Sequence, residues 1–194
     1  MRKLLPWLAI VAVLLAVGGG VALWASQRQA HMVDQIAELS PQQQPKDAGD
    51  KALLASRIAA AKQQPDDPLR WNALGNMLFA LEAFPQAESA YRKSVEIDGS
   101  QADVWSLMGE ARVRQGTEQD PVSVTAMFAF NQALRLNPAD LRAHFYVSMA
   151  DYNAGRRSKA ISRMQYVVEA SGEDDMARTA ARQTLDQWNA GATP

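Results

Sequence analysis

The sequence contains no cysteine and only two histidines, His31 and His144. Without cysteine the chain forms no disulfide, holds no cysteine-ligated zinc, uses no thiolate in catalysis and attaches no haem covalently. Attachment of a lipid to an N-terminal cysteine is excluded for the same reason. His31 has no second ligand at metal-binding spacing, and His144 lies where a packing side chain is expected. No metal site is therefore predicted.

Patterns typical of enzymes are missing as well. The sequence has no Gly-rich phosphate loop, no Ser/His/Asp arrangement and no stripe of basic and aromatic residues. Its 20 Lys and Arg residues nearly balance 21 Asp and Glu residues, and the formal net charge of −1 argues against general nucleic-acid binding. We expect a protein that is not an enzyme and needs no cofactor.

Residues 1–26 form a long apolar run. It begins with Arg2 and Lys3 and has no charged residue from Leu4 to Ser26. About 20 apolar residues suffice to cross a bilayer, so the run predicts a transmembrane signal anchor. A cleaved signal peptide, for which "LWA" before Ser26 would be the cleavage site, is the alternative. The basic residues predict a cytoplasmic N-terminus, with the rest of the chain across the membrane.

The remainder of the chain is expected to be all-α. Residues 27–50 are rich in glutamine and proline, which is typical of a linker. From Lys51 onward apolar residues recur at helical spacing, and no alternating strand pattern appears. Residues 51–67 are expected to form a capping half-repeat helix. Residues 173–194 are expected to form a C-terminal capping helix and tail, with Trp188 docked on the last repeat.

The segment between these caps contains internal repeats. Trp71-x2-Leu74-Gly75, followed by Ala87-x3-Tyr91, matches the tetratricopeptide (TPR) pattern of about 34 residues. Three units follow one another at 68–101, 102–140 and 141–172. A right-handed α-solenoid of three helical hairpins is therefore predicted, because such units bury their apolar faces only by stacking on one another.

The second and third units match less completely than the first. The second has Trp105 and Gly109 at the pattern's positions, whereas the third has His144 and Ser148 there. The glycines are expected to let the two helices of a hairpin approach closely, while the tryptophans fill the gap between them.

The second unit also contains an insertion. Its closing signature, which includes Phe130, arrives late in the register, so residues 116–120 ("GTEQD") are surplus. Asp120 followed by Pro121 is typical of a helix start, since Asp caps the helix and Pro suits its first turn. A loop within the hairpin, closed at Asp120, is predicted.

Together these features resemble the cytochrome c biogenesis subunits of the NrfG and CcmI (CycH) type. The resemblance covers Lys51 to about Asn189. It rests on "LLASRIAAAKQQPDDPLRWNALG", on the lengthened turn before "AFNQALRLNPADLRA", and on "ADYNAGRRSKAISRMQYVVEA". One apolar N-terminal run and a length of 194 residues resemble the short NrfG form more than the CcmI form.

The resemblance implies a single-pass protein of the bacterial inner membrane with its C-terminal body in the periplasm. It implies an adaptor without catalytic activity that holds apocytochrome c, by its C-terminal segment, for a haem lyase complex. The alternative is a general TPR scaffold for protein–protein interaction in envelope assembly or secretion, because a repeat fold specifies a groove and not its ligand.

In TPR proteins, set positions of each first helix line the concave groove. The expected peptide-binding residues are Asn72, Asn76 and Phe79 in the first unit, Ser106, Glu110, Val113 and Arg114 in the second, and Arg142, Phe145, Met149, Tyr152 and Asn153 in the third.

Some TPR proteins grip a terminal carboxylate with Lys and Asn side chains. This sequence keeps Asn76 and has Arg142 at a basic position, but it departs from the pattern at Asn72, Leu107 and Tyr146. A looser grip, in which Arg142 and Arg114 meet an acidic group of the ligand, is one hypothesis. In the other, both arginines are solvated surface charges.

Overall fold

The computed structural model describes residues 33–34, 38–116, 122–173 and 175–190. Within these ranges all regular secondary structure is helical. The elements are α2 (Ala48–Gln63), α3 (Pro68–Ala80), α4 (Phe84–Ile97), α5 (Ala102–Val113), α6 (Val124–Leu136), α7 (Leu141–Asn153), α8 (Arg157–Ala170) and α9 (Met176–Ala190).

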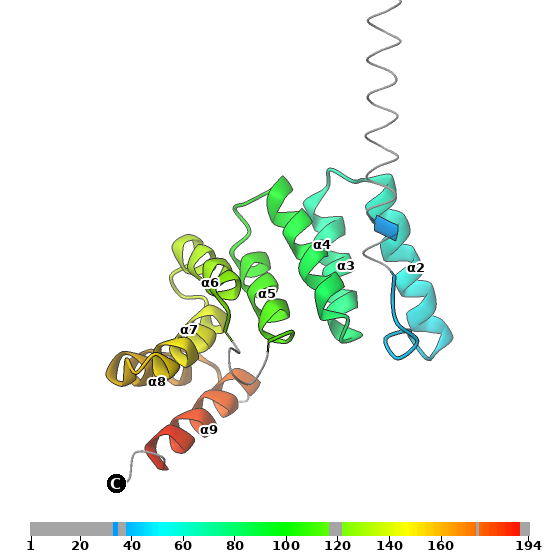
Figure 1. The fold of residues 1–194 in the computed structure, drawn as a ribbon. Coiled ribbons are helices and arrows are strands. Elements are labelled where there is room, and N and C mark those ends of the chain that lie inside the picture. Colours follow the sequence, from blue (N-terminus) through cyan, green and yellow to red (C-terminus); the bar gives the residue numbers. More distant parts are fainter. Residues whose placement is uncertain (1–32, 35–37, 117–121, 174, 191–194) are drawn as a thin grey trace, which may run out of the picture.

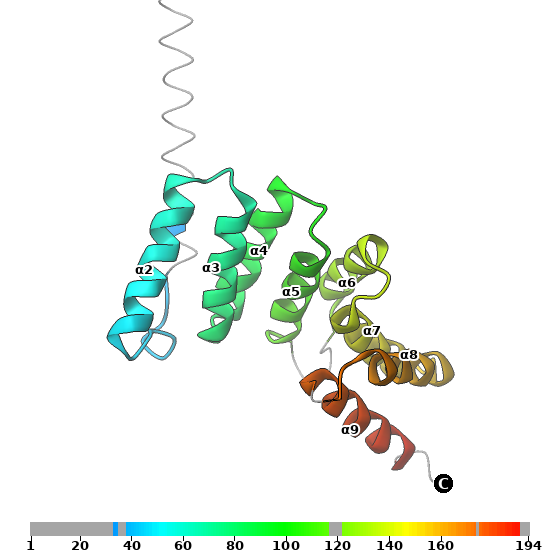
Figure 2. The ribbon, with the colours of Figure 1, turned by 180° about the vertical axis from the view of Figure 1, so that it is seen from behind.

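The helices form a curved row of hairpins (Figures 1 and 2). The most extensive packing joins α3 to α4, α5 to α6, and α7 to α8. Successive hairpins meet through α4 with α5 and α6 with α7, while α2 packs on α3 and α9 packs on α8. This all-helical architecture is consistent with the predicted TPR-like solenoid.

The close approach within each hairpin depends on a glycine facing an aromatic ring. A Cβ atom added to Gly75 would lie 2.6 Å from the ring of Tyr91, and one added to Gly109 would lie 2.7 Å from the ring of Phe130. The glycines therefore make room for Tyr91 and Phe130 rather than for the tryptophans, which corrects the expected packing.

Gly75→Ala should lower the free energy of unfolding by about 2 kcal/mol, within the range for overpacking a core. The added methyl group would collide with the ring of Tyr91, which is fully buried. Urea denaturation followed by circular dichroism measures the change. Gly172→Ala is the control, because a Cβ there meets nothing within 4 Å; an equal loss in both variants would contradict the close-packing argument.

The third hairpin solves the same packing problem with different residues. Ser148 replaces the glycine and is fully buried, and its partner on α8 is Met164 rather than an aromatic ring. The Ser148 hydroxyl donates to the Phe145 carbonyl at 2.7 Å and lies 3.7 Å from the Met164 sulfur. A narrow, flexible methionine leaves space that a ring would occupy, so a side chain is tolerated there.

The tryptophans bind the turns that precede their helices. Trp71 Nε1 donates to the carbonyl oxygen of Pro65 at 2.8 Å, and Trp105 Nε1 donates to that of Gly99 at 2.9 Å. Each carbonyl lies six residues before its partner, in the turn that joins one hairpin to the preceding helix. The tryptophans thus fix the joints of the array.

His144 keeps this bond although it replaces the tryptophan. Its Nε2 lies 2.8 Å from the Pro138 carbonyl oxygen, and its Nδ1 lies 3.0 Å from Nη1 of Arg163. The neutral tautomer protonated at Nε2 satisfies both contacts, because Nε2–H donates to the carbonyl and Nδ1 accepts from the guanidinium. His144 is half-buried and has a structural role, as predicted.

The second hairpin begins its second helix later than predicted. α6 starts at Val124, and its cap is Ser123, whose hydroxyl accepts from the backbone N–H of Ala126 at 3.4 Å. The predicted helix start at Asp120 and Pro121 is therefore wrong. Both residues, and most of the predicted insertion, lie outside the described residues. Residues 114–123 join α5 to α6, whereas residues 81–83 suffice between α3 and α4.

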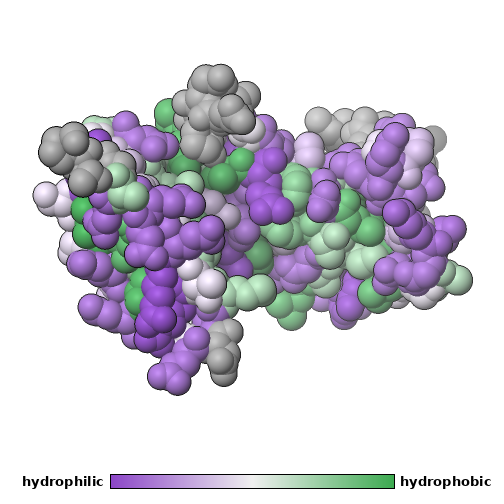
Figure 3. Space-filling model, turned by 90° about the horizontal axis from the view of Figure 1, so that it is seen from below, coloured by the Kyte–Doolittle hydropathy of each residue, from purple (hydrophilic) through white to green (hydrophobic). Residues whose placement is uncertain are grey.

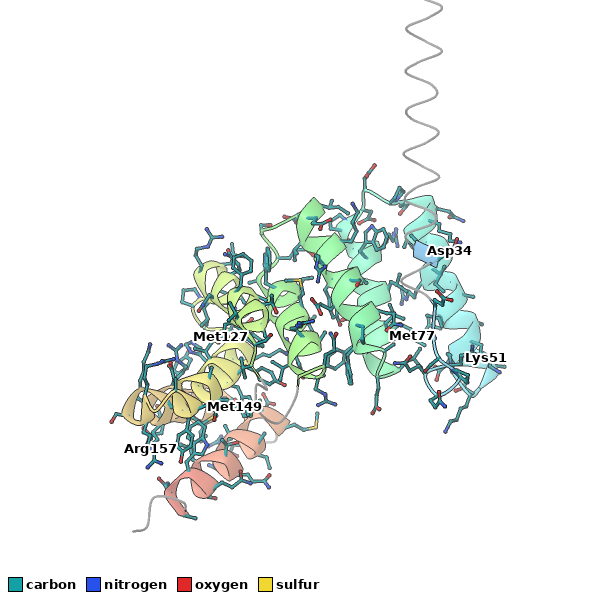
Figure 4. All side chains as sticks on the ribbon, in the orientation of Figure 1. Asp34, Lys51, Met77, Met127, Met149 and Arg157 are labelled. Carbon is teal, nitrogen blue, oxygen red and sulfur yellow. The ribbon has the colours of Figure 1, made fainter. Side chains whose placement is uncertain are left out.

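The segment before α2 packs on the body more closely than a linker would. Val33 is fully buried against the first core cluster, and Asp34 pairs with Lys62. The Gln86 side chain donates to the Glu38 carbonyl at 2.9 Å. Figure 4 shows Asp34 beside α2.

α2 begins at Ala48 rather than at Lys51, because the Asp47 side chain accepts from the backbone N–H of Asp50. The apolar run at 1–26 lies outside the described residues. Among the described helices, none combines the length and apolar character needed to cross a membrane.

Candidate peptide-binding groove

An open groove of about 780 Å³ lies between α5, α7 and the start of α9. We call it the peptide groove. Its walls include Glu110 and Arg114 of α5, Arg142 and Phe145 of α7, and Met176 of α9. Four of these five are residues predicted to bind a peptide. Met176 was not predicted, because α9 lies outside the repeat and repeat counting does not reach it.

Arg142 is neutralised within the peptide groove. Its Nε lies 2.7 Å from Oε2 of Glu110, and the Tyr146 hydroxyl donates to Oε1 of the same carboxylate at 3.2 Å. Burial, followed by the negative charge of Glu110, raises the pKa of Tyr146 well above its usual range, so this hydroxyl remains a donor at neutral pH. Arg142 is thus not an isolated surface charge, and its guanidinium is already paired rather than free to bind the carboxylate of a ligand.

Arg114 is the more available cation. It is exposed at the end of α5, and its guanidinium lies 5.0 Å from the centre of the Phe84 ring. No carboxylate of the described residues lies within ion-pair distance of it. The nearby Asp175 is engaged as a cap, since its side chain accepts from the Ala177 backbone N–H at 2.8 Å. A cation over an aromatic ring at the mouth of a groove suits an acidic ligand group.

Several other predicted groove residues face the interior. Ser106 is fully buried and its hydroxyl donates to the Asp140 side chain at 2.9 Å, which removes it from the groove. Val113 and Met149 pack against core clusters, and Met149 lies on α7 where that helix meets α9 (Figure 4). Residues at positions that face the groove in a regular repeat here contact other helices instead: Ser106 bonds the cap of α7, and Met149 packs toward α9.

Tyr152 is covered by the last helix. Trp188 of α9 stacks on the Tyr152 ring with centroids 4.2 Å apart and planes 5° apart. The guanidinium of Arg157 lies over the same ring, 5.4 Å from its centre. The predicted docking of Trp188 on the third hairpin is confirmed, and it leaves Tyr152 little free surface. Asn153 is exposed at the end of α7, outside the lining of the peptide groove.

The three predicted binding residues of the first hairpin lie apart from the peptide groove. Asn76 accepts a hydrogen bond from the Tyr91 hydroxyl at 2.9 Å, and Phe79 packs edge-to-face on Phe84 at 5.2 Å. The Asn72 side-chain oxygen is buried without a hydrogen-bond partner among the described atoms. None of these three predicted residues lines the peptide groove.

The peptide groove has mixed walls and no metal-binding arrangement. In the part of the chain that the structure describes, no group of three or more His, Asp or Glu side chains is placed to hold a metal ion. Figure 3 shows the surface from below, where hydrophobic patches alternate with hydrophilic side chains. Such a surface suits a peptide better than a small cofactor.

Among curated proteins, the chain is similar to two cytochrome c biogenesis proteins. No family model matches the chain. It is 26% identical over 133 residues to the cytochrome c-type biogenesis protein CycH of Bradyrhizobium diazoefficiens. It is also 26% identical over 149 residues to the protein of the same name from Pseudomonas aeruginosa. The chain is a relative of these CycH proteins. The CycH matches cover 69% and 73% of this chain but only 36% of each relative, so the chain spans about a third of the length of CycH.

Proposed function

We propose that the chain is a non-catalytic adaptor in cytochrome c biogenesis. It binds a segment of apocytochrome c, by the C-terminal part of that polypeptide, and presents it to a haem lyase complex. The similarity to CycH supports a role in cytochrome c biogenesis. The observation that carries the binding role is the peptide groove between α5, α7 and α9, with its mixed walls and with Arg114, which pairs with no carboxylate of the described residues.

The chemistry of the groove suits a segment with apolar side chains and an acidic group. Phe145 and Met176 offer apolar contacts, and Met176 is 86% exposed, so a ligand would bury it. Arg114 would bind a side-chain or terminal carboxylate through a charge-assisted hydrogen bond. Glu110 and Arg142 neutralise each other, so this part of the groove selects neither an acidic nor a basic ligand residue.

We also propose that the apolar run at 1–26 holds the body at the periplasmic face of the bacterial inner membrane. The uncharged stretch after Arg2 and Lys3 supports this. Anchoring beside a haem lyase raises the effective concentration of the adaptor, so a modest affinity for the apocytochrome segment is sufficient.

The experiment that tests the function is a calorimetric titration of the full chain with apocytochrome c and with the same cytochrome after haem attachment. We expect tighter binding of the apo form, because only an unfolded segment can enter the groove. Equal affinity for the two forms would contradict the adaptor. Failure of apocytochrome to bind, together with binding of an envelope-assembly or secretion component, would favour the scaffold alternative.

Met176→Asp should weaken apocytochrome binding at least tenfold, because it places a negative charge in the peptide groove beside the expected acidic group. Titration calorimetry measures the change. Val124→Asp is a matched control: Val124 is also 86% exposed and also opens a helix, but it lies outside the peptide groove. An equal loss of affinity in both variants would contradict the assignment of the site.

A further inference from the structure

A second groove, of about 590 Å³, lies between α4, α5 and α6. We call it the outer groove. Its floor is formed by Trp105, Met108 and Arg112 of α5. With 3.6 residues per turn, these side chains point away from the face of α5 that carries Glu110 and Arg114. The outer groove and the peptide groove therefore lie on opposite faces of one helix.

The outer groove stays open because α4 and α6 have no extensive contact with each other. Each packs mainly on its own hairpin partner and on α5 or α7. Val124, Thr125 and Phe128 of α6 line the side of this space that lies opposite α4.

The wall formed by α6 is apolar and exposed. Val124 is 86% exposed and Phe128, one turn later on the same face, is 56% exposed. Phe128 packs edge-to-face on Trp105 with centroids 5.9 Å apart, so the two rings are already ordered. Together with Val95 on α4, which is 6% exposed, they line a groove with apolar walls, which is typical of an interaction site.

One end of the outer groove has a surplus of positive charge. The Glu88 carboxylate is shared by Arg92, at 2.5 Å, and Arg112, at 3.7 Å, and it also accepts from Gln115 at 2.9 Å. Two guanidinium groups thus face one carboxylate, and the arginine side chains are 55% and 43% exposed. At the other end Glu96 is paired with Lys93 at 3.9 Å. A ligand carboxylate would complete the arginine pair.

From this arrangement we propose that the outer groove docks an amphipathic α-helix of a partner protein, with one acidic residue directed at Arg92 and Arg112. The lining of α4 runs from Glu88 to Glu96, about 12 Å at 1.5 Å per residue, which matches about two turns of a docked helix. Two helices walling an apolar trough present ridges between which a third helix packs. This proposal is independent of apocytochrome binding, and it gives the chain two opposed interaction faces.

The probe is a synthetic fluorescein-labelled helical peptide of about 15 residues, with leucines on one face and two glutamates near one end. Fluorescence anisotropy with the full chain should show binding at least tenfold tighter than for the same peptide with lysines in place of the glutamates. Val124→Asp should weaken the glutamate peptide at least tenfold, whereas Met176→Asp should leave it unchanged. Arg112→Gln should reduce the preference for glutamate over lysine.

Three results would overturn the proposal. Equal binding of the two peptides, or no binding of either, would remove the charge-directed helix as the occupant. Weakening by Met176→Asp but not by Val124→Asp would place the peptide in the peptide groove instead. Concentration-dependent dimerisation in sedimentation, abolished by Val124→Asp, would identify a second copy of the chain as the occupant. Unchanged circular dichroism of each variant is the control for folding.

Discussion

Phe130→Ala should lower the free energy of unfolding by about 3–5 kcal/mol, the range for removing a buried aromatic side chain. Phe130 is fully buried, and its ring occupies the space left by Gly109 on the facing helix. It also stacks on Tyr146 of the next hairpin, with centroids 5.0 Å apart and planes 14° apart. One ring therefore closes its own hairpin and joins it to the next.

The matched control for this prediction lies on the same helix. Phe128→Ala removes the same side chain from a position that is 56% exposed and should cost only about 1 kcal/mol, because less than half of its area is buried. Urea denaturation of both variants measures the difference. Losses of similar size would contradict the role assigned to Phe130. Because Tyr146 holds Glu110, loss of the Phe130 ring should also loosen the peptide groove.

Asp151→Asn should lower the free energy of unfolding by about 3 kcal/mol, the lower end of the range for breaking a buried ion pair. Asp151 is 2% exposed. Among the described residues it is the one carboxylate that has three cationic side chains within ion-pair distance. Its Oδ1 accepts from Nε of Arg156 at 2.8 Å, while its Oδ2 lies 3.7 Å from Lys159 and 3.8 Å from Arg163. Asparagine keeps the shape but leaves these cations uncompensated.

The lower end of the range applies because two of the three cations can return to water. The Arg156 and Lys159 side chains are 54% and 61% exposed, whereas that of Arg163 is 21% exposed. Asp103→Asn, at an exposed position of α5, is the control and should change stability by less than about 0.5 kcal/mol. Thermal melts of both variants give the comparison. If Asp151→Asn melts like the wild type, the cluster contributes no net stability.

The repeat pattern predicts those parts of the fold that depend on local sequence. Gly75 and Gly109 locate the close contacts of two hairpins, and Ala87, the small residue of the repeat pattern, is fully buried. Periodicity predicts the helices because apolar side chains at helical spacing must face a neighbour. It also predicts that Trp188 docks on the third hairpin, since an amphipathic helix at the end of an array must cover the apolar face beside it.

The parts that sequence reasoning missed depend on contacts between distant residues. The pattern places Arg142 in the groove but does not show that Glu110 on the preceding hairpin neutralises it. It places Ser106 on the groove face, although the cap residue Asp140 draws its hydroxyl inward. The helix start at Ser123 was missed because "DP" is a stronger local signal than "SV", and the fold uses the later cap.

The bonds from Trp71, Trp105 and His144 to the turns before their helices bear on which positions of the protein can change in evolution. None of the three lines the peptide groove, so these bonds hold the joints of the array independently of Arg114 and Met176. Substitutions at Arg114 or Met176 can therefore alter what is recognised without altering the shape that presents it. At these two positions recognition and geometry can therefore evolve separately.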